Sequence, residues 1–212
     1  MKEQLNHGYS ETEERLNVWS HGLGLLASSI VFPFLIVKAT NYSNFWDIAS
    51  FVIYGVSLLV LYAASTFYHA AKNPKKRRLL NIFDHAAIYA LIAGSYTPFC
   101  LVALDSDLGW YMFIAVWIFA LTGIILKLFF TGRFDKISTA MYLLMGWQVV
   151  FFIKPLMVAL PSFNLNLLIG GGVFYTIGAV LYSIKKIPYN HAIFHVFVLL
   201  GSISHFIAIY YL

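Results

Sequence analysis

Seven long apolar runs occupy almost the whole chain. Their approximate limits are 19–39, 48–70, 80–102, 109–130, 137–159, 165–185 and 190–211. Each run is close to the length of about 20 mostly apolar residues that a helix needs to cross a bilayer. Inside lipid, only helices and closed barrels satisfy all of their backbone hydrogen bonds. The runs therefore predict an all-α integral membrane protein, a bundle of seven transmembrane helices.

The composition agrees with a single membrane domain. Of the 212 residues, 60% are hydrophobic and 11% are charged, which is far from the balance of a soluble globular domain. We expect residues 1–18 to form a cytosolic N-terminal segment and residues 19–212 to form the seven-transmembrane domain. The first 20 residues do not have the basic start and apolar middle of a secretory signal, so we expect them to be retained. Because Cys100 is the single cysteine, no intramolecular disulfide is expected.

The basic residues of the connections gather on one side of the predicted bundle. They are Lys72, Lys75, Lys76, Arg77, Arg78, Arg133, Lys136, Lys185 and Lys186. The connections on the opposite side contain neither Lys nor Arg. The positive-inside rule then places the amino terminus inside and, after seven spans, the carboxyl terminus outside. The net charge of +5 is explained by these loops and by anionic lipid, and we expect no nucleic-acid partner.

Three histidines lie near the expected cytosolic ends of the apolar runs. His69 ends the second run, and His191 and His195 begin the last one with an i, i+4 spacing that puts both on one helix face. Ionisable side chains inside a membrane are costly and usually have a partner or a function. Three neutral imidazoles suit zinc and leave a fourth position open, as in catalytic sites. We therefore predict a Zn²⁺ ion held by these three side chains.

Asp84 and Ser65 are expected at the same depth. A zinc ion with an open position activates water, and Asp84 is the expected base for that water. Ser65 precedes His69 by one helical turn, and it is expected to contact the water, a substrate oxygen or a ligand imidazole. Taken singly, each histidine has a simpler interpretation as an interfacial residue. Asp84 has one as an ion-pair partner of Arg77 or Arg78.

Three further histidines are not expected to bind the metal. His85 points about 100° away from Asp84 on a helix. His205 lies about 15 Å beyond His195 along its helix, too far to complete the site. His7 belongs to the N-terminal tail, where no role is expected.

Five separated motifs occur in order along the chain. They are Glu14-Arg15-x-Asn17-x-x-Ser20-His21, Ser65-x-x-x-His69, Asp84 near the start of the third run, Ala93-Gly94-Ser95-Tyr96-Thr97-Pro98-Phe99, and His191-x-x-x-His195. With them, the chain resembles the bacterial haemolysin III proteins of the progestin and adipoQ receptor (PAQR) family over essentially its whole length. The resemblance implies a bacterial plasma-membrane protein with seven helices, its amino terminus inside. It also implies zinc on His69, His191 and His195, with Asp84 and Ser65 beside the metal.

The resemblance favours one function among three. The wider group is similar to alkaline ceramidases, so we expect a metal-dependent hydrolase of lipid amides or esters. Its substrate would resemble a sphingolipid or fatty amide, and its active site would lie in the cytosolic leaflet. One alternative is a non-enzymatic lipid sensor or membrane-homeostasis receptor with structural zinc, and another is a pore-forming haemolysin. The apolar runs contain no amphipathic stripe suited to a pore wall. A protein hormone partner is not expected, since the outer loops are short.

Overall fold

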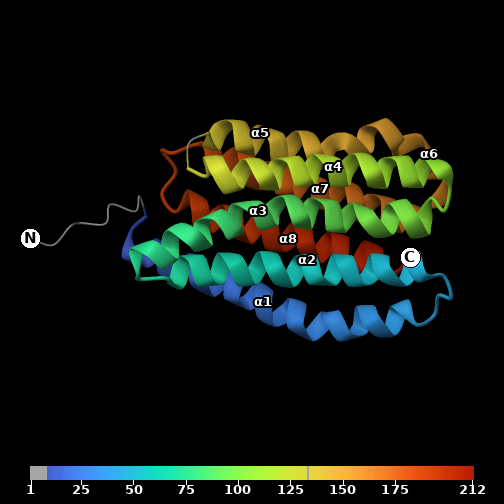
Figure 1. Ribbon diagram of the computed structural model, residues 1–212, viewed down its shortest axis with the longest axis horizontal. Coiled ribbons are helices and arrows are strands. Elements are labelled where there is room, and N and C mark those ends of the chain that lie inside the picture. The colour runs from blue at the N-terminus through green and yellow to red at the C-terminus, as the bar shows by residue number, and fades with distance from the viewer. Residues whose placement is uncertain (1–8, 133) are drawn as a thin grey trace, which may run out of the picture.

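The structure, a computed structural model, describes residues 9–132 and 134–212, so the expectations for His7 and Arg133 fall outside it. Within the described residues, seven helical segments are long and apolar enough to cross a membrane, and none of these residues forms a strand. Figure 1 shows the long helices lying side by side along the long axis of the molecule. The predicted all-α class with seven spans is confirmed.

Eight α-helices and two shorter helical segments build the seven spans. They are α1 (Glu11–Ala39), α2 (Phe45–Ala70), α3 (Pro74–Pro98), the π-helix η1 (Phe99–Ala103), α4 (Asp107–Phe130), α5 (Asp135–Gly146), the 3₁₀-helix η2 (Trp147–Phe152), α6 (Ile153–Ala159), α7 (Ser162–Ser183) and α8 (Asn190–Tyr210). The π-helix η1 extends α3 within the third span, and α5, η2 and α6 together supply the fifth.

The first helix starts earlier than the apolar run that reveals it. The Ser10 hydroxyl accepts a hydrogen bond from the Glu13 backbone N–H at 3.2 Å, and this Ser-x-x-Glu spacing is a typical helix start. Helix α1 therefore begins at Glu11, eight residues before the approximate start of the first apolar run. Hydropathy reports where a chain is apolar, and the first two turns of α1 are polar. The division into a cytosolic segment and a membrane domain stays a prediction.

The fifth span is a broken helix, and a side chain from a neighbouring helix forms hydrogen bonds with its backbone at the break. Pro155 has no N–H and cannot bond to the carbonyl four residues earlier. Upstream of it, the Tyr96 hydroxyl donates to the Gly146 carbonyl at 2.6 Å and accepts from the Val149 N–H at 2.8 Å. An irregular backbone at membrane depth is tolerated when its polar groups are satisfied inside the protein. The break faces α3, from which Tyr96 comes.

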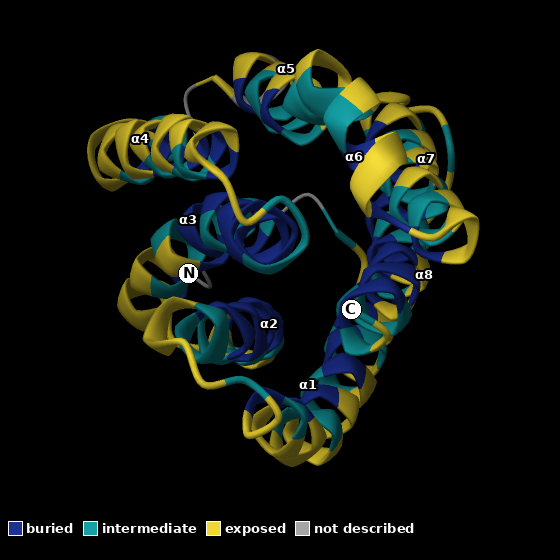
Figure 2. Ribbon diagram, turned by 90° about the vertical axis from the view of Figure 1, so that its right-hand side faces the viewer, coloured by how far each residue is buried: buried dark blue, intermediate teal, exposed yellow. Residues whose placement is uncertain are grey.

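The spans surround an interior cavity, and α4, which contributes Met112 to its lining, packs mainly against α3. Neighbouring contacts link α3 to α2, α2 to α1, α1 to α8 and α8 to α7, and α5 contacts both α3 and α7. Seen end-on, this order forms a ring (Figure 2). Buried apolar residues fill the contacts between helices, among them Phe51, Tyr54 and Met112. Large apolar side chains point outward, as expected for a surface that faces lipid.

Candidate metal centre

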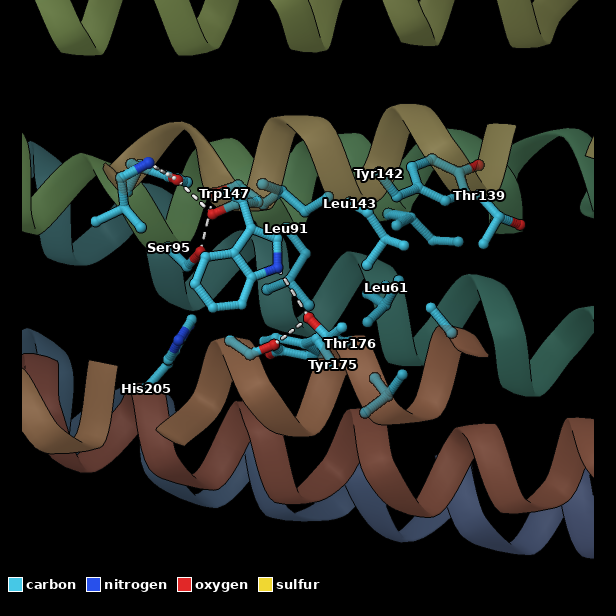
Figure 3. Close-up of a pocket in the computed structure, with 18 of the residues that line it drawn as sticks. Leu61, Leu91, Ser95, Thr139, Tyr142, Leu143, Trp147, Tyr175, Thr176 and His205 are labelled. Carbon is cyan, nitrogen blue, oxygen red and sulfur yellow. Dashed lines mark hydrogen bonds between the residues drawn. The ribbon is translucent and has the colours of Figure 1, made fainter. Parts of the chain in front are cut away.

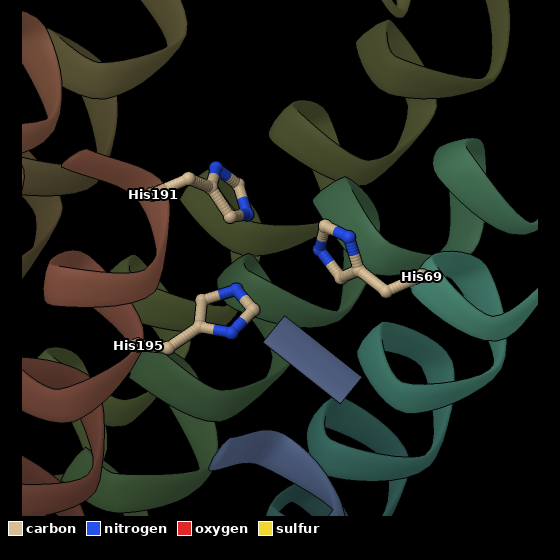
Figure 4. A group of neighbouring side chains, drawn as sticks. All are labelled: His69, His191 and His195. Carbon is tan, nitrogen blue, oxygen red and sulfur yellow. The ribbon is translucent and has the colours of Figure 1, made fainter. Parts of the chain in front are cut away.

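The three histidines predicted as metal ligands lie together at one end of the bundle. His69 comes from the last turn of α2, and His191 and His195 come from the first turns of α8. All three are buried, and one nitrogen from each lies within 4.8 Å of the others. Figure 4 shows the rings converging from the two helices. We call His69, His191 and His195 the three-histidine cluster.

Glu14 and Arg77 fix the orientation of the His69 ring. Its Nδ1 lies 2.7 Å from Glu14 Oε2 and therefore donates to the carboxylate. The Arg77 guanidinium pairs with the other oxygen of Glu14, and it also lies 3.4 Å from the His69 carbonyl at the end of α2. A carboxylate bonded to Nδ1 sets the tautomer of a metal-binding histidine and raises its basicity. This chain of contacts ties α1, α2 and α3 together at the cluster.

Hydroxyl groups contact Nδ1 of the other two rings. His195 Nδ1 lies 3.1 Å from Ser20 Oγ, and Ser20 gives its own proton to the Asn17 carbonyl at 3.1 Å, so the ring is the donor. His191 Nδ1 lies 2.9 Å from the Tyr9 hydroxyl. Burial raises the pKa of the Tyr9 phenol well above its usual value, which keeps this hydroxyl neutral. Each ring of the cluster thus has a side-chain partner on Nδ1.

The opposite nitrogens are left for a ligand. With the proton on Nδ1 of His69 and of His195, Nε2 of these two rings presents a lone pair. The same tautomer at His191, with Nδ1 donating to the Tyr9 oxygen, would leave a lone pair on Nε2 of the third ring. Nε2 of His69 and of His191 is buried and has no hydrogen-bond partner among the described residues, a situation that costs about 1–3 kcal/mol per group. A divalent cation satisfies such lone pairs, and three imidazoles form a donor set that zinc accepts. The residues present therefore fit a metal ion.

Asp84 and Ser65 line the same cavity as two of the cluster histidines. The cavity has a volume of about 310 Å³ and is also lined by His191 and His195. Ser65 Oγ is buried without a hydrogen-bond partner among the described residues, and Asp84 is buried near the start of α3. The two side chains are thus placed where a carboxylate and a hydroxyl can reach a ligand in this cavity.

The simpler interpretation of Asp84 as an ion-pair partner of Arg77 differs from the observed contacts. Among the described ion pairs, Arg77 binds Glu14 and not Asp84. His85 lies outside the cluster, with its Nδ1 2.9 Å from the Asn81 carbonyl and 4.0 Å from Asp84 Oδ2. His85 lines the cavity, so it belongs to the surroundings of Asp84.

The sequence prediction assigned no role at the site to residues of α1 or to Tyr9 before it. The His21 ring stacks on His195 with centroids 3.5 Å apart and planes 8° from parallel, and both of its nitrogens are buried without described partners. Tyr9, Glu14 and Ser20 had no predicted contact with the histidines. A signal existed, because the buried positions of α1 recur every three or four residues. These positions begin with Glu13, Asn17, His21, Gly24 and Ser28.

The fold and the cluster define a multi-pass membrane protein with a candidate metal centre buried at one end of its helix bundle. The chain belongs to the haemolysin III-related family, whose model, described as "Haemolysin-III related", matches residues 9–206. It is 47% identical to the hemolysin-3 homolog of Bacillus subtilis (strain 168), over 93% of this chain and 92% of the relative. It is 43% identical to hemolysin-3 of Bacillus cereus, over 93% and 90%. Identity to the monocyte to macrophage differentiation factor of Homo sapiens is 28%, over 93% and 83%.

These matches confirm the resemblance inferred from the five motifs. They cover nearly all of the chain, including the residues of the three-histidine cluster. Together with the seven spans, the bacterial relatives support the plasma membrane as the location of the protein.

Proposed function

We propose that this protein is a zinc-dependent hydrolase of lipid amides or esters, similar to a ceramidase, with its active site in the cytosolic leaflet. One observation carries the proposal. The cavity that reaches His191 and His195 is also lined by the buried Asp84 and by Ser65, whose hydroxyl has no hydrogen-bond partner among the described residues. An enzyme that hydrolyses amides or esters in this way needs a Lewis acid, a proton acceptor and a binding site for the substrate. This cavity brings together residues suited to each role.

The roles of the residues follow from their chemistry. A zinc ion on the three-histidine cluster would supply a Lewis acid that polarises a carbonyl and makes water more acidic. Asp84 is the group that can accept the proton from the attacking water and return it to the leaving group. Ser65 Oγ is free to donate a hydrogen bond to the carbonyl side of the substrate. Glu14 keeps the proton of His69 on Nδ1, so that Nε2 stays available.

The lining of the cavity favours a lipid substrate. Away from its polar groups, the wall is built by apolar side chains of α2, α3 and the fifth span, including Leu61, Ile88, Leu91, Ile92 and Ile153. Its volume of about 310 Å³ is at the lower end of the range for small-molecule sites. An acyl chain matches such a wall, since each buried methylene contributes about 0.8 kcal/mol.

Hydrolysis by the purified, zinc-loaded protein tests the proposal. A panel of lipid amides and esters is incubated with wild type and with Asp84→Asn, and released fatty acid is measured by mass spectrometry. We expect the variant to lose turnover by at least about 100-fold while its zinc content is unchanged. The matched control is Asp107→Asn, in the first turn of α4 and outside the described cavity lining. Equal rates for Asp84→Asn and wild type on a verified substrate would exclude Asp84 as the base.

A structural role for the metal is the second candidate. His69 and the other two ligands belong to α2 and α8, and each of these helices packs on α1, so a bound ion would clip remote parts of the bundle together. If none of the lipids in the panel is hydrolysed, this arrangement favours a lipid sensor in which zinc holds the helices together. Chelation would then lower the unfolding temperature without changing any turnover. A pore-forming role is suggested by the names of the Bacillus relatives alone.

A further inference from the structure

The cavity extends far beyond the three-histidine cluster, to a second polar region that the proposed reaction does not use. Its lining includes Ser95 from α3, Trp147 from η2, Thr176 from α7 and His205 from α8. Figure 3 shows His205 pointing from α8 toward the side of the cavity where Ser95 and Trp147 lie. We call these four residues the distal subsite. His205 and His195 are ten residues apart on α8, which separates them by about 15 Å along the helix.

The tautomer of His205 follows from its single described hydrogen bond. Nε2 lies 3.1 Å from the Leu168 carbonyl, which can only accept, so Nε2 carries the proton. Nδ1 is then a lone pair, buried and without a partner among the described residues. The His205 ring packs against Gly171, where an added Cβ would lie only 2.2 Å from His205 Cδ2. His205 is 8% exposed, so its acceptor nitrogen is buried.

The other polar groups of the subsite already donate their protons in hydrogen bonds within the protein. The Ser95 hydroxyl donates to the Ile92 carbonyl at 2.8 Å. Thr176 Oγ1 donates to the Gly172 carbonyl at 2.7 Å and accepts from Trp147 Nε1 at 2.9 Å. Hydroxyl oxygens keep acceptor capacity after donating. The distal subsite therefore offers acceptors, and a ligand group that fits it must donate a hydrogen bond.

We infer that the distal subsite binds a hydroxyl group carried on the acyl chain of the ligand, with His205 Nδ1 as its acceptor. The inference rests on the proposed function, which places the carbonyl end of the lipid at the three-histidine cluster. An extended chain of single bonds advances by about 3.3–3.6 Å for every three bonds, as an extended peptide does. The distance of about 15 Å along α8 therefore corresponds to about 12 bonds of an extended acyl chain. The preferred chain therefore carries its hydroxyl about 12 bonds from the carbonyl carbon.

Competition between two fatty acids tests this inference directly. The probes are octadecanoic acid and the same acid with a hydroxyl on about its twelfth carbon. Both are added in equal amounts to zinc-loaded, full-length protein in detergent micelles, and the bound acids are quantified by mass spectrometry. Protein-free micelles correct for partitioning. We expect wild type to favour the hydroxylated chain about tenfold, the effect of one buried hydrogen bond. A hydroxyl at the methyl end of the chain serves as the misplaced control and should show no such preference.

Three variants separate the subsite from general packing. His205→Leu removes the acceptor, and Gly171→Ala displaces the His205 ring by contact with Cδ2. Both variants should lose the preference, so that the two acids are bound in equal amounts. Gly170→Ala is the matched control, because its Cβ meets only Ser204 Oγ at 3.7 Å. It should keep the preference of wild type. A purely structural role for His205 would change the unfolding temperature and leave the ratio of bound acids unaltered.

Each outcome decides the inference. If wild type binds both acids equally, or binds neither, the distal subsite does not recognise a hydroxyl and the inference fails. If His205→Leu and Gly171→Ala keep the preference, another group is the acceptor. Failure of the proposed function is seen separately, as equal turnover by Asp84→Asn and wild type or as no hydrolysis of any lipid in the panel. A hydroxyl preference without any hydrolysis would support a lipid-binding protein that uses the same subsite.

Discussion

The two ends of the cavity use histidine in opposite ways. At the three-histidine cluster, Nδ1 is the nitrogen with a side-chain partner, and Nε2 of His69 and of His191 lacks one within the described part of the chain. At the distal subsite, Nε2 of His205 is bonded to a carbonyl, and Nδ1 has no partner among the same residues. In both places the bonded nitrogen decides which lone pair remains for a ligand. Three converging lone pairs suit a cation, and a single one suits a hydrogen-bond donor.

The most severe way to break this comparison is to remove a cluster ligand. We expect His191→Ala to lose essentially all bound zinc, because two imidazoles do not complete a protein site of three ligands. The matched control is His205→Ala on the same helix, which should keep its zinc. Elemental analysis of the purified proteins measures both. Zinc retained by His191→Ala, or lost equally by both variants, would show that the two ends do not differ as described.

The Glu14 partner sharpens the comparison at the cluster. Loss of a partner that fixes a metal ligand typically lowers metal affinity 10–100-fold, and we expect this range for Glu14→Gln. The neutral amide of Gln lacks the negative charge that favours a proton on His69 Nδ1, and Arg77 also loses its ion pair. A titration against a competing chelator measures the affinity. Glu11→Gln is the control, since Glu11 pairs with Arg15 at the surface and should leave the affinity within about twofold. An unchanged affinity for Glu14→Gln would remove the basis for the assigned tautomer.

Much of the bundle was predictable from the sequence because lipid imposes a simple rule on each span. Long apolar runs located all seven spans, and the i, i+4 pair on α8 indicated two of the three clustered histidines. The start of α1 and the broken fifth span were not predictable in the same way. Both depend on polar contacts, such as that of Tyr96 with the backbone of the fifth span, which hydropathy does not report.

The surroundings of the site depended on packing between remote helices. Tyr9 and Ser20 meet His191 and His195 across more than 170 residues of sequence, and no local pattern specifies such pairs. His205 was expected to lie too far along α8 to join the cluster. Its place in the same cavity as Asp84 depends on how α7 and α8 pack against the fifth span. Composition and spacing do not carry that information.

A smaller effect is expected at the neutral partner of His195. Ser20→Ala removes the hydroxyl 3.1 Å from His195 Nδ1, and hydrogen bonds between neutral groups are roughly half as strong as those with a charge. We therefore expect zinc affinity to fall by less than about tenfold, in the same chelator titration. Ser29→Ala is the control, because the Ser29 hydroxyl is exposed and bonds within its own helix. A loss larger than that of Glu14→Gln would mean that charge is not what distinguishes the two partners.

The smallest effect on zinc is expected from Ser202, which lies between the two ends. Ser202 Oγ accepts from the Tyr62 hydroxyl at 2.7 Å and lies 3.0 Å from the Tyr175 hydroxyl. In Ser202→Ala the buried Tyr62 hydroxyl loses its acceptor, so the free energy of unfolding should fall by about 1–3 kcal/mol. Thermal unfolding in micelles measures this, with Ser29→Ala again as the control. Zinc affinity should stay within about twofold, since the nearest link to the cluster is the edge contact of His21 with the Tyr62 ring at 5.1 Å. A larger change in affinity would show that the two ends respond to each other through His21, which also stacks on His195.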